Sequence, residues 1–208
     1  MKTNDDAKTT LLFVGDSDIS NWPSDFFPTR PPEVKLVSDA VSGAKLSDLI
    51  PMVHSFIINI TRKESRLIVV ACAGENDISS GRTVTKTLKY FDEFLSTIFH
   101  DFEQIQDNKA QCNIIFFGPK FEPWLQDDFK YRKKYRELSD GMKKACHDHP
   151  ESKAITFVDC LYMFCDKNNT DFFTPDKKYF QFDELHLSKL GYQVWKDKLE
   201  SELNSIYG

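Results

Sequence analysis

The stretch Leu11–Ser17 has the sequence LLFVGDS, and it decides the fold that we expect for this chain. Its four consecutive apolar residues have the length of a buried strand, and Gly15-Asp16-Ser17 ends that strand with a turn. The stretch Leu67–Ala73 is a second continuous apolar run, typical of a strand covered on both faces. Strands of this kind indicate a parallel sheet enclosed between layers of helices.

Apolar runs of strand length alternate with stretches of helical period along the chain. We expect strands at Leu11–Val14, Val34–Val37, Leu67–Ala73, Ile114–Phe117 and Ala154–Val158. We expect helices at Leu46–Ile60, Val84–Phe102, Trp124–His147 and Ser188–Ile206, with Ser188 as the N-cap of the last. This alternation predicts an α/β fold, a three-layer α/β/α sandwich with a central parallel sheet of about five strands, flavodoxin-like in layout. We expect one domain over residues 1–208.

Charge and cysteine content narrow the function classes. A formal net charge of -5 argues against a nucleic-acid partner, because non-specific binding to nucleic acid needs concentrated positive charge. The basic cluster Lys130–Arg136 is expected to be a solvated helix face. We expect neither a signal peptide nor a membrane span, since no long apolar stretch follows the first residues. Five cysteines at irregular spacing favour a reduced, cytoplasmic location.

Four short blocks, far apart in the sequence, contain the residue types of one hydrolytic site. They are Gly15-Asp16-Ser17, Gly43 within VSGA, Asn76 within GEND, and Asp183-Glu184-Leu185-His186. The first three blocks follow predicted strands. Because the carboxyl ends of parallel strands meet at one edge of a sheet, where sites gather, we expect these blocks to lie close together.

The residue types in these blocks suit acyl transfer from an ester. A serine hydroxyl is a weak nucleophile until a base accepts its proton, so Ser17 needs a histidine, and His186 is the candidate. Asp183 precedes His186 by three residues, a spacing that places both side chains on one face of a helical turn, and would orient the imidazole. The N–H groups of Ser17 and Gly43 and the side-chain amide of Asn76 would donate to the oxyanion. No cofactor is expected.

In this order, the blocks resemble those of the SGNH hydrolases, also called the GDSL esterase/lipase family, which is named for its Ser, Gly, Asn and His. The matching residues are Ser17, Gly43, Asn76 and His186, and the stretches Ser42–Leu49 and Asp183–Trp195 are also similar to the family's second and last blocks. The resemblance implies a serine esterase that forms an acyl-enzyme on Ser17 and hydrolyses a small-molecule carboxylic ester. Acetyl or short-chain acyl esters are favoured because the chain has no lid-sized extra domain.

Two positions depart from the family's pattern. Asp18 stands where family members commonly have an apolar residue, and Asn21 stands where a frequent variant has glycine. Asp18 places a negative charge beside the nucleophile and is therefore a candidate substrate-binding residue, together with Trp22, Phe180 and Phe182. Other aromatic residues also flank the first and last blocks: Phe26, Phe27, Phe172, Phe173 and Tyr179. Packing is the alternative role for each of these aromatic residues, and equally for Trp22, Phe180 and Phe182.

Other roles for these polar residues stay open. We expect Asp16 and Asp77 to be structural carboxylates, and Asp159 is an alternative to Asp183 as the orienting acid. No metal is expected, because the possible zinc ligands do not have the close spacing of structural zinc sites. These possible ligands are Cys160 with Cys165, or Cys146 with His147 and His149. The alternative functions are a thioesterase or lysophospholipase of the same family, or a catalytically inactive relative that binds an acylated ligand or partner.

Overall fold

Five parallel strands form one central sheet in the order β2-β1-β3-β4-β5. The computed structural model describes residues 9–28, 34–60, 66–105, 110–125, 127–166 and 174–207. The strand bounds are Thr9–Gly15 for β1, Val34–Ala40 for β2, Arg66–Cys72 for β3, Gln111–Phe117 for β4 and Ile155–Val158 for β5. This is the strand order of flavodoxin-like sheets, so the predicted fold class is confirmed.

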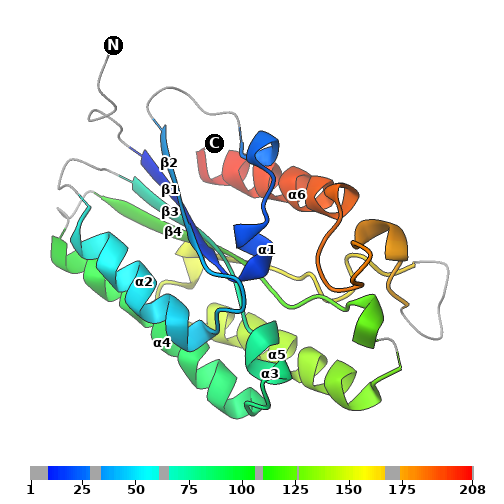
Figure 1. Ribbon diagram of the computed structural model, residues 1–208. Helices are drawn as coiled ribbons and strands as arrows, with labels where there is room; N and C mark the ends of the chain where they lie inside the picture. The colour runs from blue at the N-terminus through cyan, green and yellow to red at the C-terminus, as the bar shows by residue number, and fades with distance from the viewer. Residues whose placement is uncertain are drawn as a thin grey trace.

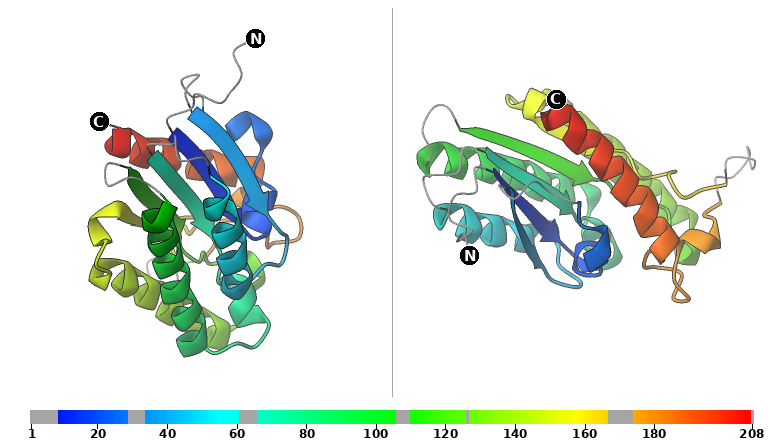
Figure 2. Two further views of the ribbon diagram at one scale, coloured as in Figure 1. Left: turned by 90° about the vertical axis from the view of Figure 1, so that its left-hand side faces the viewer. Right: turned by 90° about the horizontal axis from the view of Figure 1, so that it is seen from above.

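Helices cover both faces of the sheet, which gives the predicted three layers (Figures 1 and 2). One face is covered by α2 (Leu46–Ile58), α4 (Val84–Ile105) and α5 (Phe129–Asp148), and the other by α6 (Lys189–Tyr207) with the short α1 (Ser17–Ser20). Successive side chains of β1 enter opposite cores, because strand side chains alternate in direction. Within the described ranges, no helix has the length and apolar character needed to cross a membrane.

The strands end level at their carboxyl edge. Gly15 at the end of β1 pairs with Ala40 of β2 and with Cys72 of β3, and Cys72 pairs with Phe117 of β4. The loops that leave β1, β2, β3 and β4 therefore start side by side. The helix α3 (Glu75–Ser79) begins in one of these loops, directly after β3.

Several predicted elements differ from the structure in their bounds: β1 begins at Thr9, β4 begins at Gln111 and α4 continues to Ile105. The second strand is longer than expected and continues to Ala40. The third predicted helix begins at Phe129 rather than near Trp124, because the Asp128 carboxylate accepts from the N–H groups of Lys130 and Tyr131, each at 3.0 Å, and so caps the first turn there. The predicted loop Asp159–Asp183 contains a short 3-10 helix, η5 (Lys177–Tyr179). The predicted N-cap of α6 is confirmed, since the hydroxyl of Ser188 accepts a hydrogen bond from the N–H of Gly191 at 3.3 Å.

Gly15 fits at the end of β1 because it has no side chain. A Cβ at this position would lie 2.5 Å from the carbonyl oxygen of Cys72 and 2.6 Å from Cγ1 of Ile19. The first of these is backbone of the neighbouring strand and cannot move aside. Glycine therefore allows β1 to turn into α1 in contact with β3.

We expect Gly15→Ala to lower the free energy of unfolding by about 1–3 kcal/mol, as overpacking of a well-packed site does. Urea denaturation followed by circular dichroism would measure the change. The matched control is Ser20→Ala, at an exposed position of the same short helix, which should stay within about 0.5 kcal/mol of wild type. Equal stability of Gly15→Ala and wild type would contradict the close contact between this turn and β3.

Candidate active site

Ser17 is the first residue of α1, directly after the end of β1. The buried Asp16 is the N-cap of this helix, and its Oδ1 accepts from the N–H of Asp18 at 3.0 Å. The carboxylate thus holds the turn on which Ser17 lies, as expected for a structural Asp16. The side chain of Ser17 is half-buried, so its hydroxyl remains accessible to a ligand.

The Gly43 and Asn76 blocks lie at the same edge of the sheet. Gly43 has a φ of 80°, a left-handed conformation that glycine adopts without strain. Among the described residues, none accepts a hydrogen bond from the N–H of Ser17 or of Gly43. The Asn76 amide, by contrast, donates to the carbonyl oxygen of Ala44 at 3.1 Å and to Oδ2 of Asp16 at 3.3 Å.

Asp77 joins the second and third blocks. Its carboxylate is fully buried, accepts from the N–H of Leu46 at 3.0 Å and pairs with the guanidinium of Arg82. Burial raises the pKa of Asp77, while Leu46 and Arg82 favour its charged form. Asp77 is structural, as expected: it ties the start of α2, just after Gly43, to α3, which carries Asn76.

Asp183 and His186 form a hydrogen-bonded pair. The imidazole Nδ1 lies 2.6 Å from Oδ2 of Asp183, and Oδ1 of Asp183 accepts from the N–H groups of Leu185 and His186, each at 3.0 Å. Partial burial acts to raise the pKa of Asp183, but the bonds from His186 and Leu185 outweigh it and lower this pKa to about 2. Asp183 is therefore an anion at neutral pH. The alternative acid, Asp159, instead lies 3.5 Å from the ammonium of Lys143.

The turn that carries this pair is fixed by its backbone. The N–H of Gln181 donates to the carbonyl oxygen of His186 at 2.7 Å, and Phe180 pairs with Leu187 in an antiparallel bridge. Glu184, at the tip, has a φ of 59°, which few residues other than glycine adopt. Its carbonyl oxygen accepts from the N–H of Trp124 at 3.4 Å, so the turn is also attached to the segment that follows β4.

Ser17, Asn76 and His186 line one pocket of about 130 Å³. The nucleophile, the amide and the base of the predicted site therefore line a common space, although Ser17 and His186 are 169 residues apart in sequence (186 − 17). Gly43 is exposed and is not among the described residues that line this pocket. The remaining neutral lining residues are Ser79, Trp124, Tyr135 and Leu185.

A buried ion cluster that sequence reasoning missed forms part of the pocket lining. The ammonium of Lys120 lies 2.6 Å from Oδ2 of Asp18, 2.9 Å from Oε2 of Glu75 and 3.0 Å from Oε1 of Glu122. We call these four residues the Lys120 cluster; all four line the pocket. Lys120 is 1% exposed, and its backbone N–H also donates to Oε1 of Glu75 at 2.7 Å. Its position in the sequence, two residues after Gly118 and just beyond the carboxyl end of β4, is the one signal that could have indicated a place at the site.

The cluster strongly perturbs its own ionisation. Burial acts to lower the pKa of Lys120, but the Asp18, Glu75 and Glu122 carboxylates outweigh it and hold that pKa well above its usual value. Lys120 is thus a cation despite its burial. Burial raises the pKa of Asp18 and of Glu122, since a single ammonium only partly compensates the removal of several carboxylates from water.

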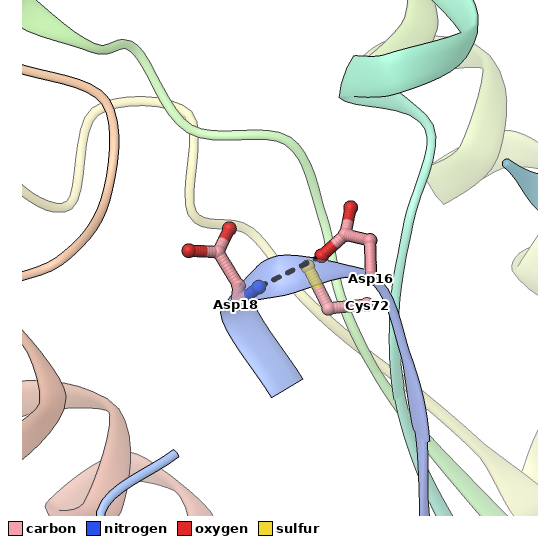
Figure 3. A group of neighbouring side chains, drawn as sticks. All are labelled: Asp16, Asp18 and Cys72. Atoms are coloured by element: carbon pink, nitrogen blue, oxygen red, sulfur yellow. Dashed lines mark hydrogen bonds between the residues drawn. The ribbon is translucent and has the colours of Figure 1, made fainter. Parts of the chain in front are cut away.

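Asp16, Asp18 and Cys72 are the described side chains with the spacing of a possible metal site, with ligand atoms within 4.8 Å of one another (Figure 3). Their bonding does not favour a metal. Oδ1 of Asp16 accepts from the N–H of Asp18, as the dashed line in Figure 3 marks, and Lys120 already supplies a cation to Asp18. Burial raises the pKa of the Cys72 thiol, which keeps it in the protonated form that binds metals poorly.

The sequence model of the family described as GDSL-like Lipase/Acylhydrolase matches residues 11–199. The chain belongs to this family. The match covers all four blocks, and with them every segment that contributes to the pocket. No curated protein matched the chain.

Solved structures of GDSL-like proteins and other esterases have the same fold as this GDSL-like chain. A member of the lipolytic protein G-D-S-L family from Veillonella parvula superposes with a TM-score of 0.68 at 15% identity, over 93% of this chain and 97% of that chain. The carbohydrate acetylesterase Est24 from Sinorhizobium meliloti gives 0.64 at 14% identity, over 96% and 100%. The lipase/acylhydrolase from Enterococcus faecalis gives 0.62 at 15%, over 94% and 95%.

The structure corrects the expectation that Trp22 and Phe180 bind substrate in this GDSL-like protein. Each is only 5% exposed and packs in the core on the α6 face, where the Trp22 ring stacks on Trp195 with centroids 6.0 Å apart. Phe182 is fully exposed, and none of the three is among the described residues that line the pocket. Asp18 does line it. Phe172 and Phe173 lie outside the described residues.

We expect Lys120→Met to lower the free energy of unfolding of this GDSL-like protein by about 3–5 kcal/mol, because it leaves buried carboxylates without their cation. Chemical denaturation would measure the loss. The matched control is Lys133→Met, because Lys133 pairs with Glu137 at 3.8 Å on the surface, and an exposed pair of this kind contributes only about 0.5 kcal/mol. Similar stability of the two variants would show that the cluster does not need its ammonium.

Proposed function

We propose that this chain is a serine esterase that hydrolyses acetyl or short-chain acyl esters of small molecules through an acyl-enzyme. The observation that carries the proposal is the pocket that Ser17, Asn76 and His186 share, together with the hydrogen bond between Asp183 and Nδ1 of His186. Membership of the GDSL-like family supports the same chemistry. The residues of the site need no metal or cofactor for it.

In the proposed reaction, Ser17 Oγ attacks the ester carbonyl while Nε2 of His186 accepts the hydroxyl proton. Nδ1 keeps its proton on the Asp183 side, because Asp183 is held as an anion by three hydrogen bonds and stabilises the imidazolium that forms. His186 then protonates the departing alcohol. A water molecule attacks the acyl-enzyme with His186 as its base, which releases the acid and restores Ser17.

The tetrahedral oxyanion needs donors that are already in place. The N–H groups of Ser17 and Gly43 have no acceptor among the described residues, which supports this role for both. Asn76 is the third proposed donor, although both of its amide protons have protein acceptors. We propose that the oxyanion replaces Asp16 as the acceptor of one Asn76 amide proton, because the 3.3 Å hydrogen bond to Asp16 is the longer of the two.

The size and polarity of the pocket support a small acyl group. Its volume of about 130 Å³ is below the several hundred Å³ of typical ligand sites, and the charged residues of the Lys120 cluster are part of its lining. A lining of this size and charge gives little favourable contact to an extended alkyl chain. The five cysteines are free in the structure, which supports our further proposal of a reduced, cytoplasmic location.

We expect Ser17→Ala to lower kcat for p-nitrophenyl acetate by at least about a thousandfold, as loss of a triad nucleophile does. Ser20→Ala, three residues further along the same helix and exposed, is the matched control and should retain wild-type turnover. Release of p-nitrophenolate would be followed by absorbance. If Ser17→Ala and wild type share one low rate, the chain is an inactive relative or acts on other substrates, and the proposed nucleophile is wrong.

We expect kcat/KM to fall from p-nitrophenyl acetate to butyrate and again to octanoate, by roughly tenfold or more over the series. The reason is that the pocket is small and the charged residues of the Lys120 cluster are part of its lining, which disfavours added methylene groups. The same absorbance assay measures all three esters, and Ser17→Ala supplies the background for each. A rate that rises toward octanoate would contradict the short-chain proposal and favour a lysophospholipase or lipase.

A further inference from the structure

The carboxylate oxygens of four acidic residues that line the pocket can be accounted for one by one. The two oxygens of Asp16 accept from Asp18 N–H and the Asn76 amide, and those of Glu75 from the backbone N–H and the ammonium of Lys120. Glu122 accepts from the ammonium and, through Oε2, from the indole N–H of Trp124 at 2.5 Å. Oδ2 of Asp18 accepts from the ammonium at 2.6 Å. The remaining oxygen, Oδ1 of Asp18, is buried and has no donor among the described residues.

Three donor groups in this region serve other acceptors. Each of the three ammonium protons of Lys120 serves a different carboxylate, and the indole N–H of Trp124 serves Glu122. The hydroxyl of Tyr192 donates to the backbone carbonyl of Asp18, at 2.9 Å, and not to its side chain. A buried acceptor without a donor costs free energy, so a ligand that brings a donor to Asp18 gains affinity by satisfying it.

Asp18 is also placed to meet a substrate. It is 2% exposed, lines the same pocket as Ser17 and His186, and directly follows Ser17 in sequence. A group attached to the carbon next to an ester carbonyl, or to the alcohol close to the ester oxygen, lies only a few atoms from the point of attack on Ser17. The open oxygen can therefore discriminate between substrates without touching the reacting atoms.

We propose that Asp18 determines which esters this site prefers. Its unpaired Oδ1 accepts a hydrogen bond from a hydroxyl or ammonium group that a small ester carries close to its carbonyl. The proposal rests on the ester hydrolysis proposed above and names its substrate class: small polar esters with an O–H or N–H donor, in preference to alkyl esters of the same size. Esters of small hydroxy acids or amino acids carry such a donor on the acyl side. Monoesters of diols carry it on the alcohol side.

Matched ester pairs separate the donor from other effects of the substituent. On the acyl side, methyl glycolate and methyl methoxyacetate both have an oxygen next to the carbonyl carbon and similar inductive activation, but only glycolate has a donor. On the alcohol side, 2-hydroxyethyl acetate and 2-methoxyethyl acetate differ in the same way. Acid release in a pH-stat gives kcat/KM for each ester with wild type, and Ser17→Ala gives the background.

We expect wild type to prefer the hydroxyl ester of one pair by about tenfold to a hundredfold, the usual range for one hydrogen bond to a charged group. The pair that shows this preference identifies whether the donor is on the acyl or the alcohol side. Ratios near one in both pairs, with hydrolysis that depends on Ser17, would overturn the specificity proposal and leave the esterase intact. Absence of any hydrolysis that depends on Ser17 would overturn the proposed function itself.

Asp18→Asn tests the residue directly. The asparagine can keep an oxygen on Lys120, and its NH₂ group then replaces the open acceptor with a donor. We expect the preference for the hydroxyl ester to fall to about one or to reverse, whatever the absolute rates, because each ratio is taken within one enzyme. An unchanged ratio in a folded Asp18→Asn protein would show that the donor is recognised elsewhere. If the variant does not fold, the wild-type ratios still decide the proposal.

Discussion

The ammonium of Lys120 lies where three segments of the sheet edge meet. Its carboxylate partners are Asp18 of α1, Glu75 of α3 and Glu122 of the segment after β4. Asp18 adjoins Ser17 in sequence and Glu75 adjoins Asn76, so one cation connects the segments that carry these two residues. Glu122 extends this connection through Trp124, whose backbone N–H reaches Glu184. The relative positions of the candidate nucleophile, oxyanion donor and base therefore depend on one buried charge.

A buried ion pair seldom adds net stability over an apolar replacement, because both charges lose their water. The gain in this protein is better described as geometric. Apolar side chains could fill the same volume in several arrangements, whereas an ammonium with three protons and three carboxylates at 2.6, 2.9 and 3.0 Å has few alternatives. The departure from the family pattern at Asp18 belongs to this arrangement, since an apolar residue there would remove one of the three acceptors.

Much of the architecture follows from local sequence signals. The buried strands, the caps at Asp16 and Ser188 and the clustering of three blocks at one sheet edge rest on apolar runs, short-range hydrogen bonds and parallel topology. Each of these acts over a few residues or through a general rule. A structural role was also expected for Asp77, but its partner Leu46 lies 31 residues away and no local signal identifies that contact.

The Lys120 cluster and the correction at Trp22 and Phe180 needed the three-dimensional structure. Lys120 bonds to Asp18 across 102 residues and to Glu75 across 45, and a lysine after a strand ordinarily points into water. Nearness in sequence to a functional block does not fix the direction of a side chain either. Trp22 lies just after α1 and packs against Trp195 of α6, on the face of the sheet opposite α2 and α4.

The three-residue spacing of Asp183 and His186 has a consequence for how this site can change over time. Acid and base fold together as one short turn with its own backbone bonds, whereas Ser17 and Asn76 depend on the register of the sheet. Insertions between these regions can lengthen the surrounding loops while the hydrogen bond between Asp183 and His186 is kept. The turn Asp183–His186 can therefore keep its internal geometry while the loops around the candidate site change in length and sequence.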